Sequence, residues 1–337
     1  MLTKDNFQKA ARQLYDFCNN PAAQYKILFH LLDTPYDNHE LTKLRIDFLK
    51  SDIVEELYQT QDYHGGWGKL RDKDYSAKNK FPSSLTAINR CLYIGLTLED
   101  REILQFAYKY LESFLTGTSK EKLYDRNERA IPWQKASICG TIERIKPYHE
   151  LCDRIYNEWM YIISRAYETG EYVYERERDA QHEIFETRES RLVPMEVCFD
   201  LIFTRREGLS PKLEECLLRH HGEHAYHHGY FWDKTPKELP ENFIYQQTRR
   251  WFHTFNYINQ FRGSKIYLAD AANWLMENQN KDGLWDWGAQ TKDPWGYFGY
   301  FSITRQYKHN RIVDCSMEVL SFLKKYLENN EVISETK

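Results

Sequence analysis

The sequence has few of the two residues that interrupt regular structure. Its 337 residues include only 10 prolines and 15 glycines, whereas aromatic residues make up 15% of the chain. This scarcity excludes a collagen-like chain and favours helices over a loop-rich β fold. The 42% hydrophobic and 28% charged fractions are those of an ordinary globular protein, which excludes full disorder. We therefore expect a helical protein long enough to bury a substantial core.

The sequence also has no marked excess of charge of one sign. Lys and Arg number 46 against 50 Asp and Glu, so the net charge is -4. A protein that binds nucleic acid without sequence preference needs a strong basic excess, because its affinity comes from contacts with phosphates. We therefore predict no nucleic-acid partner.

Long apolar runs are missing as well. No stretch of about 18 apolar residues occurs, which is the length that crosses a bilayer as a helix. The first residues, MLTKDNFQKAARQLYDF, are charged and amphipathic and lack the apolar centre of a signal peptide. These observations predict a soluble, cytoplasmic protein without a transmembrane segment.

Paired cysteines are absent from the sequence. The seven cysteines are odd in number and scattered, and no CxxC pair occurs among them: Cys18, Cys91, Cys139, Cys152, Cys198, Cys216 and Cys315. This pattern disfavours a disulfide framework and a cysteine-rich zinc site. We expect reduced thiols in the core, with no metal and no cofactor.

The sequence does contain an internal repeat. Segments 61–67 (QDYHGGW) and 279–285 (QNKDGLW) share Gln, a Gly four positions later and a Trp two positions after that. Each follows an apolar helical segment, and its glycine stands where helices often end in the left-handed conformation. Repeated turns of this kind indicate a modular helical fold.

A second recurring feature is a basic residue ahead of an apolar helix. Its copies, at intervals of 49, 62, 59 and 61 residues, are Lys80, Arg129, Arg191, Arg250 and Arg311. This period is long enough for two helices and their connections, so each repeat is predicted to be a helical hairpin. Connections from the second helix of one hairpin to the first helix of the next are long, and long loops commonly carry functional sites.

The expected fold is an all-α (α/α)6 toroid, a barrel with an inner and an outer ring of helices. Inner helices are predicted at about 22–32, 83–96, 133–145, 193–206, 249–261 and 313–327, and outer helices at about 41–60, 99–116, 149–168, 211–221 and 265–278. The helix within residues 1–18 supplies the missing sixth outer helix and closes the ring. Residues 1–337 then form a single domain, with a disordered tail at 330–337.

The Gln-Gly-Trp turns resemble the QW-type repeat of terpenoid cyclases such as squalene-hopene cyclase, and of protein prenyltransferase β subunits. The likeness rests on segments 61–67 and 279–285 and on the run 314–323. It implies an α/α toroid that acts on an isoprenoid. In class II cyclases a DxDD motif opens an inner helix and its third Asp donates a proton, whereas the similar stretch here keeps an acid only at Asp314. The zinc ligands and the DDxxD motif of these families are absent.

The basic series suggests a binding site at the mouth of the toroid. Arg129, Arg191, Arg250 and Arg311 would converge there beside helix N-termini, which favours an anionic small molecule. The body of the ligand would lie near Trp251 and His253, and Asp314 and Glu196 are the candidate catalytic residues. Alternatively, each arginine fastens a neighbouring repeat by binding loop carbonyls or an acidic side chain.

Three functions fit these patterns. The first is an isoprenoid enzyme of cyclase or lyase type, with Asp314 as the acid. The second is a carbohydrate-active (α/α)6 enzyme, in which paired carboxylates such as Glu196 and Asp314 act as acid and base. The third is a non-catalytic module that binds a small molecule. A histidine-rich segment, 220–228, is predicted to be an exposed helix end rather than a metal site.

Overall fold

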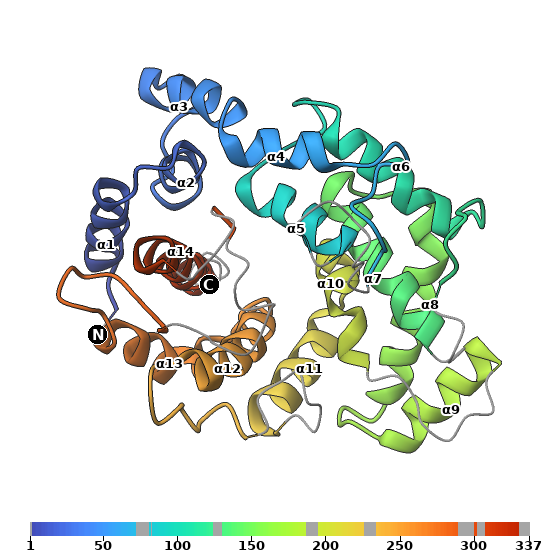
Figure 1. The fold of residues 1–337 in the computed structure, drawn as a ribbon. Coiled ribbons are helices and arrows are strands. Elements are labelled where there is room, and N and C mark those ends of the chain that lie inside the picture. Colours follow the sequence, from blue (N-terminus) through green and yellow to red (C-terminus); the bar gives the residue numbers. More distant parts are fainter. Residues whose placement is uncertain are drawn as a thin grey trace.

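The computed structural model describes residues 2–71, 81, 83–123, 130–186, 195–225, 234–288, 300–301 and 307–329, with the backbone alone at 196–197, 245–247 and 249–250 (Figure 1). Every regular element in these ranges is helical, and no strand occurs in them. The all-α class predicted from composition and periodicity is therefore confirmed. The predicted tail at 330–337 lies outside the described residues.

Two sets of helices alternate along the chain. The first set is α2 (Pro21–Lys26) with the π-helical turn η1 (Ile27–Leu31), α5 (Ser84–Ile94), α7 (Ala130–Ile145), the 3-10 turn η2 (Met195–Cys198) with α10 (Phe199–Thr204), α12 (Tyr245–Ile258) and α14 (Lys308–Glu328). The second set, the partner helices, is α1 (Lys4–Phe17), α3 (His39–Leu49), α4 (Asp52–Thr60), α6 (Ile103–Leu115), α8 (Glu150–Ala166), α11 (Pro211–Glu223) and α13 (Lys265–Glu277).

Helices of the two sets pack against each other. Three of the predicted hairpins are seen in these contacts: α2 contacts α3, α5 contacts α6, and α7 contacts α8. Helix α13 contacts α14, the first helix of the following repeat. In Figure 1 the long helix α14 lies inside an arc made by α1, α2, α12 and α13, whereas α3, α6, α8 and α11 lie toward the periphery. The predicted pairing of consecutive helices is therefore confirmed for these three hairpins.

Two features differ from the predicted elements. The expected helix at 41–60 is divided into α3 and α4 because the backbone is extended at Ser51, whose hydroxyl donates to the Phe48 carbonyl at 2.6 Å. An unpredicted helix, α9 (Tyr174–Phe185), lies against α8 in a connection that had been expected to be a loop. Its sequence is mostly charged and it buries only Glu177, Ala180 and Gln181 along its length, so it lacks a clear apolar periodicity.

The first helix is bound to the end of the chain. Helix α1 begins at Thr3, which forms a capping box with Asn6, and its buried stripe includes Phe7 and Leu14. This stripe packs on α14 and η1. The backbone N–H of Leu2 also donates to the side chain of Asn273 in α13, at 3.2 Å. The beginning of the chain thus lies beside its last two helices.

The two Gln-Gly-Trp turns have the same internal hydrogen bond. The amide of Gln61 donates to the Gly65 carbonyl at 2.9 Å, and that of Gln279 donates to the Gly283 carbonyl at 2.7 Å. Both glycines have positive φ, 94° and 72°. The prediction that they end the preceding helices is wrong, because α4 ends at Thr60 and α13 at Glu277. Each glycine instead closes the turn that follows, since its N–H donates at 3.0 Å to the carbonyl three residues earlier, at Asp62 or Asn280. The sequence repeat therefore corresponds to a repeated turn structure.

The tryptophans of both turns are fully buried and bonded in the same way. The indole N–H of Trp67 donates to a carbonyl of α4 at 3.0 Å, and that of Trp285 donates to a carbonyl of α13 at 2.6 Å. Their backbone N–H groups donate to Ser84 and Ser316, which belong to the next helices of the first set, α5 and α14. Each tryptophan therefore joins one hairpin to the next.

Candidate functional site

Most of the predicted basic series lies beyond what the structure describes. Lys80, Arg129 and Arg191 are outside the described residues, and the side chain of Arg250 in α12 is not described. The same holds for the side chain of Glu196 in η2. The participation of these residues in a site stays a prediction. Four predicted site residues, Arg311, Asp314, Trp251 and His253, can be placed.

Arg311 forms an ion pair with Asp286. Its Nε atom donates to Oδ1 of Asp286 at 2.5 Å, and its Nη2 atom donates to Oδ2 at 3.1 Å. Both side chains are largely buried, and the hydrogen bond that Arg311 donates to Asp286 raises the pKa of Arg311. Asp286 directly follows Trp285, so Arg311 fastens this turn to α14. Arg311 therefore has the role that the sequence analysis gives as the alternative to ligand binding, in which the arginine binds an acidic side chain and fastens a neighbouring repeat.

Asp314 is buried and bonded to backbone. Its Oδ1 atom accepts hydrogen bonds from the N–H groups of Tyr300 and Phe301, at 3.0 and 3.1 Å. The guanidinium of Arg90, which is only 4% exposed, donates to the Tyr300 carbonyl at 3.0 Å. Both charged residues therefore hold the short segment 300–301 against the helices.

Trp251 and His253 lie on different sides of α12. Trp251 is fully buried, with its ring 4.8 Å from that of Trp274 in the partner helix α13. His253 is exposed, and its ring lies 5.1 Å from that of Tyr257. The Tyr257 hydroxyl donates to Asp200 of α10 at 3.2 Å. Of the two, only His253 is accessible to a dissolved ligand.

Two cations that the sequence analysis did not select flank one face of α5. The ammonium group of Lys26, at the end of α2, donates to the backbone carbonyl of Tyr93 and lies 3.5 Å from the centre of the Tyr93 ring. Arg144, near the end of α7, donates to the side-chain oxygen of Asn89 at 2.9 Å. Asn89 and Tyr93 are one helical turn apart, so the two cations approach α5 side by side.

Among the described residues, no acidic side chain neutralises the charge at this place. In the described part of the chain, no carboxylate pairs with Lys26 or with Arg144. Burial of the ammonium group, and then the positive charge of Arg144, lower the pKa of Lys26 to about 7. We name this group of residues, Lys26, Asn89, Tyr93 and Arg144, the cationic cluster.

A sequence signal for the cationic cluster existed but was weak. Lys26 is followed by Ile27, Leu28 and Phe29 in a helix that had been predicted to lie inside the fold. A lysine within an inner helix is unusual because burying an ammonium group is costly. The influence of Arg144 on Lys26, however, connects residues that are far apart in the sequence, so no local pattern could have shown it.

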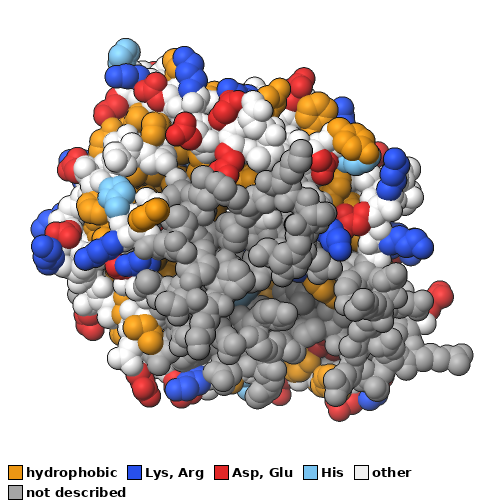
Figure 2. Space-filling view, in the orientation of Figure 1, with side chains coloured by type: hydrophobic (Ala, Val, Ile, Leu, Met, Phe, Trp, Pro, Cys, Tyr) orange, Lys and Arg blue, Asp and Glu red, His pale blue; other side chains and the backbone are white. Residues whose placement is uncertain are grey.

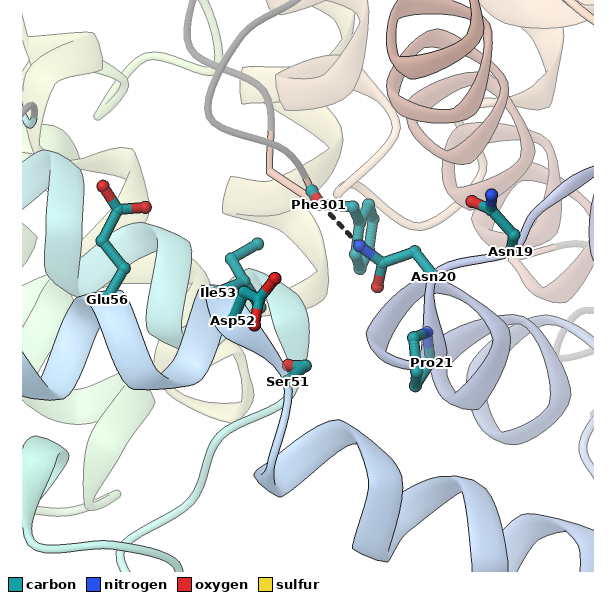
Figure 3. Close-up of a pocket in the computed structure, with 8 residues that line it drawn as sticks. All are labelled: Asn19, Asn20, Pro21, Ser51, Asp52, Ile53, Glu56 and Phe301. Atoms are coloured by element: carbon teal, nitrogen blue, oxygen red, sulfur yellow. Dashed lines mark hydrogen bonds between the residues drawn. The ribbon is translucent and has the colours of Figure 1, made fainter.

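A separate cavity of about 460 Å³ lies between the starts of α2 and α4 (Figure 3). The Asn20 amide donates to the Phe301 carbonyl at 2.7 Å, and the same side chain caps α2, so Asn20 is engaged in the fold. Carboxylates come from Asp52, which is exposed, and from Glu56, one turn later in α4. Asn19 adds an exposed amide. Such a lining suits hydroxyl or cationic groups better than an anion.

The histidine-rich segment differs from its prediction. His221 of α11 is only 2% exposed, and its ring packs perpendicular to that of Phe199 at 5.0 Å. The predicted exposed helix end is therefore wrong for His221, because the last turn of α11 packs on α10. His227 and His228 lie outside the described residues. Among residues that are described, no group of three or more His, Cys, Asp or Glu could hold a metal ion.

The comparisons with known proteins returned nothing: no family model, no curated protein and no solved structure matches the chain. Within the described ranges, every helix is too short or too polar to cross a membrane. On the face shown in Figure 2, basic and acidic side chains are interspersed over the described residues, so a functional site has to be argued from individual residues.

Proposed function

We propose that the helices form a closed (α/α)6 toroid in which α1 is the sixth outer helix. The two Gln-Gly-Trp turns support this arrangement. A Cβ atom on Gly65 would lie 2.2 Å from the Phe106 carbonyl oxygen of α6, and one on Gly283 would lie 2.5 Å from the side chain of Gln13 in α1. Helix α1 thus stands beside the second turn as α6 stands beside the first.

Deletion of residues 1–18 tests ring closure. If α1 completes the outer ring, the truncated protein exposes the side of α14 that now packs on α1, and the whole domain loses stability. The measurement is thermal unfolding of the truncated and full chains, with Asn6→Ala as a control that weakens only the helix cap. Unchanged melting of the truncated protein would contradict closure by α1.

The function that we propose is the binding of a small anionic molecule at the cationic cluster, on the inner face of the toroid. The observation that carries it is the side-by-side approach of Lys26 and Arg144 without a carboxylate partner among the described residues. An unpaired, partly desolvated cation is costly, and an anion placed between the two would offset that cost.

The chemistry of the cluster indicates how an anion would be held. The side chain of Arg144 is exposed and oriented by Asn89, so its remaining donors can form paired hydrogen bonds to a carboxylate or phosphate. Lys26 would add a point charge, and the Tyr93 ring would close one side. The isoprenoid body implied by the resemblance stays a prediction.

Titration calorimetry tests this proposal. The ligands are inorganic diphosphate, farnesyl diphosphate and glucuronate, each measured at two salt concentrations against wild type, Lys26→Met and Arg144→Met. We expect at least one anion to bind, with affinity reduced about tenfold or more by either substitution and weakened by salt. The matched controls are Lys324→Met and Arg154→Met, whose side chains are paired with Asp33 and Glu158.

The outcome can overturn the proposal in two ways. The proposal fails if none of the anions binds. It also fails if binding is as strong in Lys26→Met and Arg144→Met as in the two controls. Retained binding in those variants together with loss in Arg250→Ala would instead favour the predicted site at the mouth.

A carbohydrate is the second candidate ligand, and the cavity of Figure 3 favours it. Two carboxylates, an amide and an aromatic ring are the groups that commonly bind sugar hydroxyls and sugar rings. Here the carboxylates are Asp52 and Glu56, rather than the predicted pair Glu196 and Asp314. Titration with neutral mono- and disaccharides, compared between wild type and Asp52→Ala, tests this candidate.

A further inference from the structure

The ammonium group of Lys26 has an environment that differs from that of an ordinary surface lysine. It donates one hydrogen bond to the Tyr93 carbonyl, lies over the ring of the same residue, and has no carboxylate partner in the described ranges. A salt bridge would favour the charged form of the lysine, and none is formed with the acidic residues that the structure describes. Tyr93 also stacks on Tyr300, with ring centres 3.7 Å apart, so the aromatic surface beneath the amine is fixed.

Arg144 provides a second functional group near Lys26, whose pKa its positive charge lowers. Arg144 binds Asn89 while Lys26 binds Tyr93, and the backbone of α5 rises by about 6 Å over the four residues between them. A carboxylate on Arg144 would therefore present the atoms next to it to the Lys26 amine. A 2-oxo acid fits this short reach, because its carbonyl carbon is bonded directly to the carboxylate carbon.

We propose that Lys26 is a reactive amine that forms an imine with the carbonyl group of a small anion held by Arg144, a 2-oxo acid being the simplest member of that class. This inference rests on the proposed function, since it requires an anion at the cationic cluster.

The step balances without an oxidant or a reductant. The lone pair of the neutral Lys26 amine attacks the carbonyl carbon, and the carbonyl oxygen takes up a proton as the C–N bond forms. The resulting carbinolamine loses water as the C=N bond forms, so one amine and one carbonyl give one imine and one water. The low pKa of Lys26, about 7, supplies neutral amine near neutral pH.

The experiment is reductive trapping on the full chain. Wild type is incubated at pH 7.4 with pyruvate and cyanoborohydride, and the modified lysines are located by peptide mass mapping. We expect labelling of Lys26 to be at least ten times faster than that of Lys324, which is paired with Asp33. The variant Lys26→Arg cannot form an imine, so no label should appear at position 26. Arg154→Met, which changes a residue outside the cationic cluster, should bind pyruvate and be trapped at Lys26 as wild type is.

Calorimetry with lactate, which has the carboxylate of pyruvate but no carbonyl group to form an imine, distinguishes failure of the imine proposal from failure of anion binding. If lactate and pyruvate bind and depend on Arg144, but Lys26 is labelled no faster than Lys324, the imine is ruled out and anion binding stands. If neither binds and Lys26 is not labelled, the imine proposal fails, and anion binding is then decided by the titrations with diphosphate, farnesyl diphosphate and glucuronate. Rapid labelling that persists in Arg144→Met would refute the anchoring role of Arg144.

Discussion

The Nε atom of Arg311 lies 2.5 Å from Oδ1 of Asp286, and this ion pair joins the start of α14 to the turn after α13. Asp286 also accepts a hydrogen bond from the backbone N–H of Gly288 at 2.9 Å, so the carboxylate orders its own loop as well. The pair therefore helps to connect α13 to the next helix, α14.

The first prediction concerns this pair. Arg311→Ala and Asp286→Ala should each destabilise the protein by about 1–3 kcal/mol, because each leaves a largely buried charge without its partner. Urea unfolding of both single variants and the double variant measures their coupling, which we expect to be at least about 0.5 kcal/mol. Strictly additive effects would show that the two side chains do not interact in solution.

The second prediction concerns the tryptophans of the repeated turns. Trp67→Ala and Trp285→Ala should each cost about 3–5 kcal/mol, because both side chains are fully buried between hairpins. Tyr63 belongs to the first turn but is 85% exposed, so Tyr63→Ala is the matched control and should change stability little. A loss below about 1 kcal/mol for either tryptophan variant would contradict its burial.

The third prediction distinguishes two effects of replacing a glycine: the strain of a side chain at positive φ, and the clash of that side chain with a neighbouring helix. Gly65 and Gly117 both have positive φ, 94° and 73°, but a Cβ on Gly65 would meet the Phe106 carbonyl at 2.2 Å, whereas a Cβ on Gly117 would meet nothing within 4 Å. Gly117→Ala should therefore cost only about 1 kcal/mol, as left-handed strain alone requires. Gly65→Ala should cost clearly more in chemical unfolding. Equal losses would show that α6 does not approach the turn this closely.

The fourth prediction is a pH dependence. The pKa of Lys26 is about 7 in the folded protein, chiefly because of burial, against an ordinary value of 10.5. Between these values the unfolded chain binds more protons, so this residue makes stability rise as pH increases from about 7 to 10.5. Lys26→Met removes the free-energy cost of burying the ammonium group. We expect this variant to be more stable than wild type at pH 7 by roughly 1–3 kcal/mol, which is less than the shift in pKa would give for a fully buried lysine.

Urea unfolding at pH 7 and at about pH 9.5 checks this prediction. The stability advantage of Lys26→Met over wild type should shrink at the higher pH. Lys324→Met loses an ion pair with Asp33 and should show no such gain. A Lys26→Met variant that is less stable than wild type at pH 7 would mean that an anion or an acidic residue neutralises the lysine.

Much of the fold was predictable because its signals are local. The helix at 4–17 was expected from its amphipathic sequence, and the turns after α4 and α13 from Gln, Gly and Trp at fixed spacing. These patterns depend on the turn of a helix and on the left-handed conformation of glycine, which neighbouring residues decide. Helix α9 was missed because its burial depends on α8, which no local periodicity reports.

The candidate site was less predictable because charge environments are made by distant residues. Arg311 was selected as a ligand contact from its position in a repeat, yet its partner Asp286 lies in the preceding connection. Position in a repeat does not single out Lys26, although burial, and then the positive charge of Arg144, lower its pKa to about 7.

The sequence by itself determined that this chain is helical, that its helices come in pairs, and that equivalent turns recur at 61–67 and 279–285. Only the tertiary structure decided which charges are neutralised. Arg311 pairs with Asp286, whereas Lys26 lies over the ring of Tyr93 and is influenced by the positive charge of Arg144. The physical reason is the distance in the sequence between the interacting groups. Hydrogen bonds within a turn join residues a few positions apart, whereas the electrostatic field at a side chain is the sum over every charged group that folding brings near it.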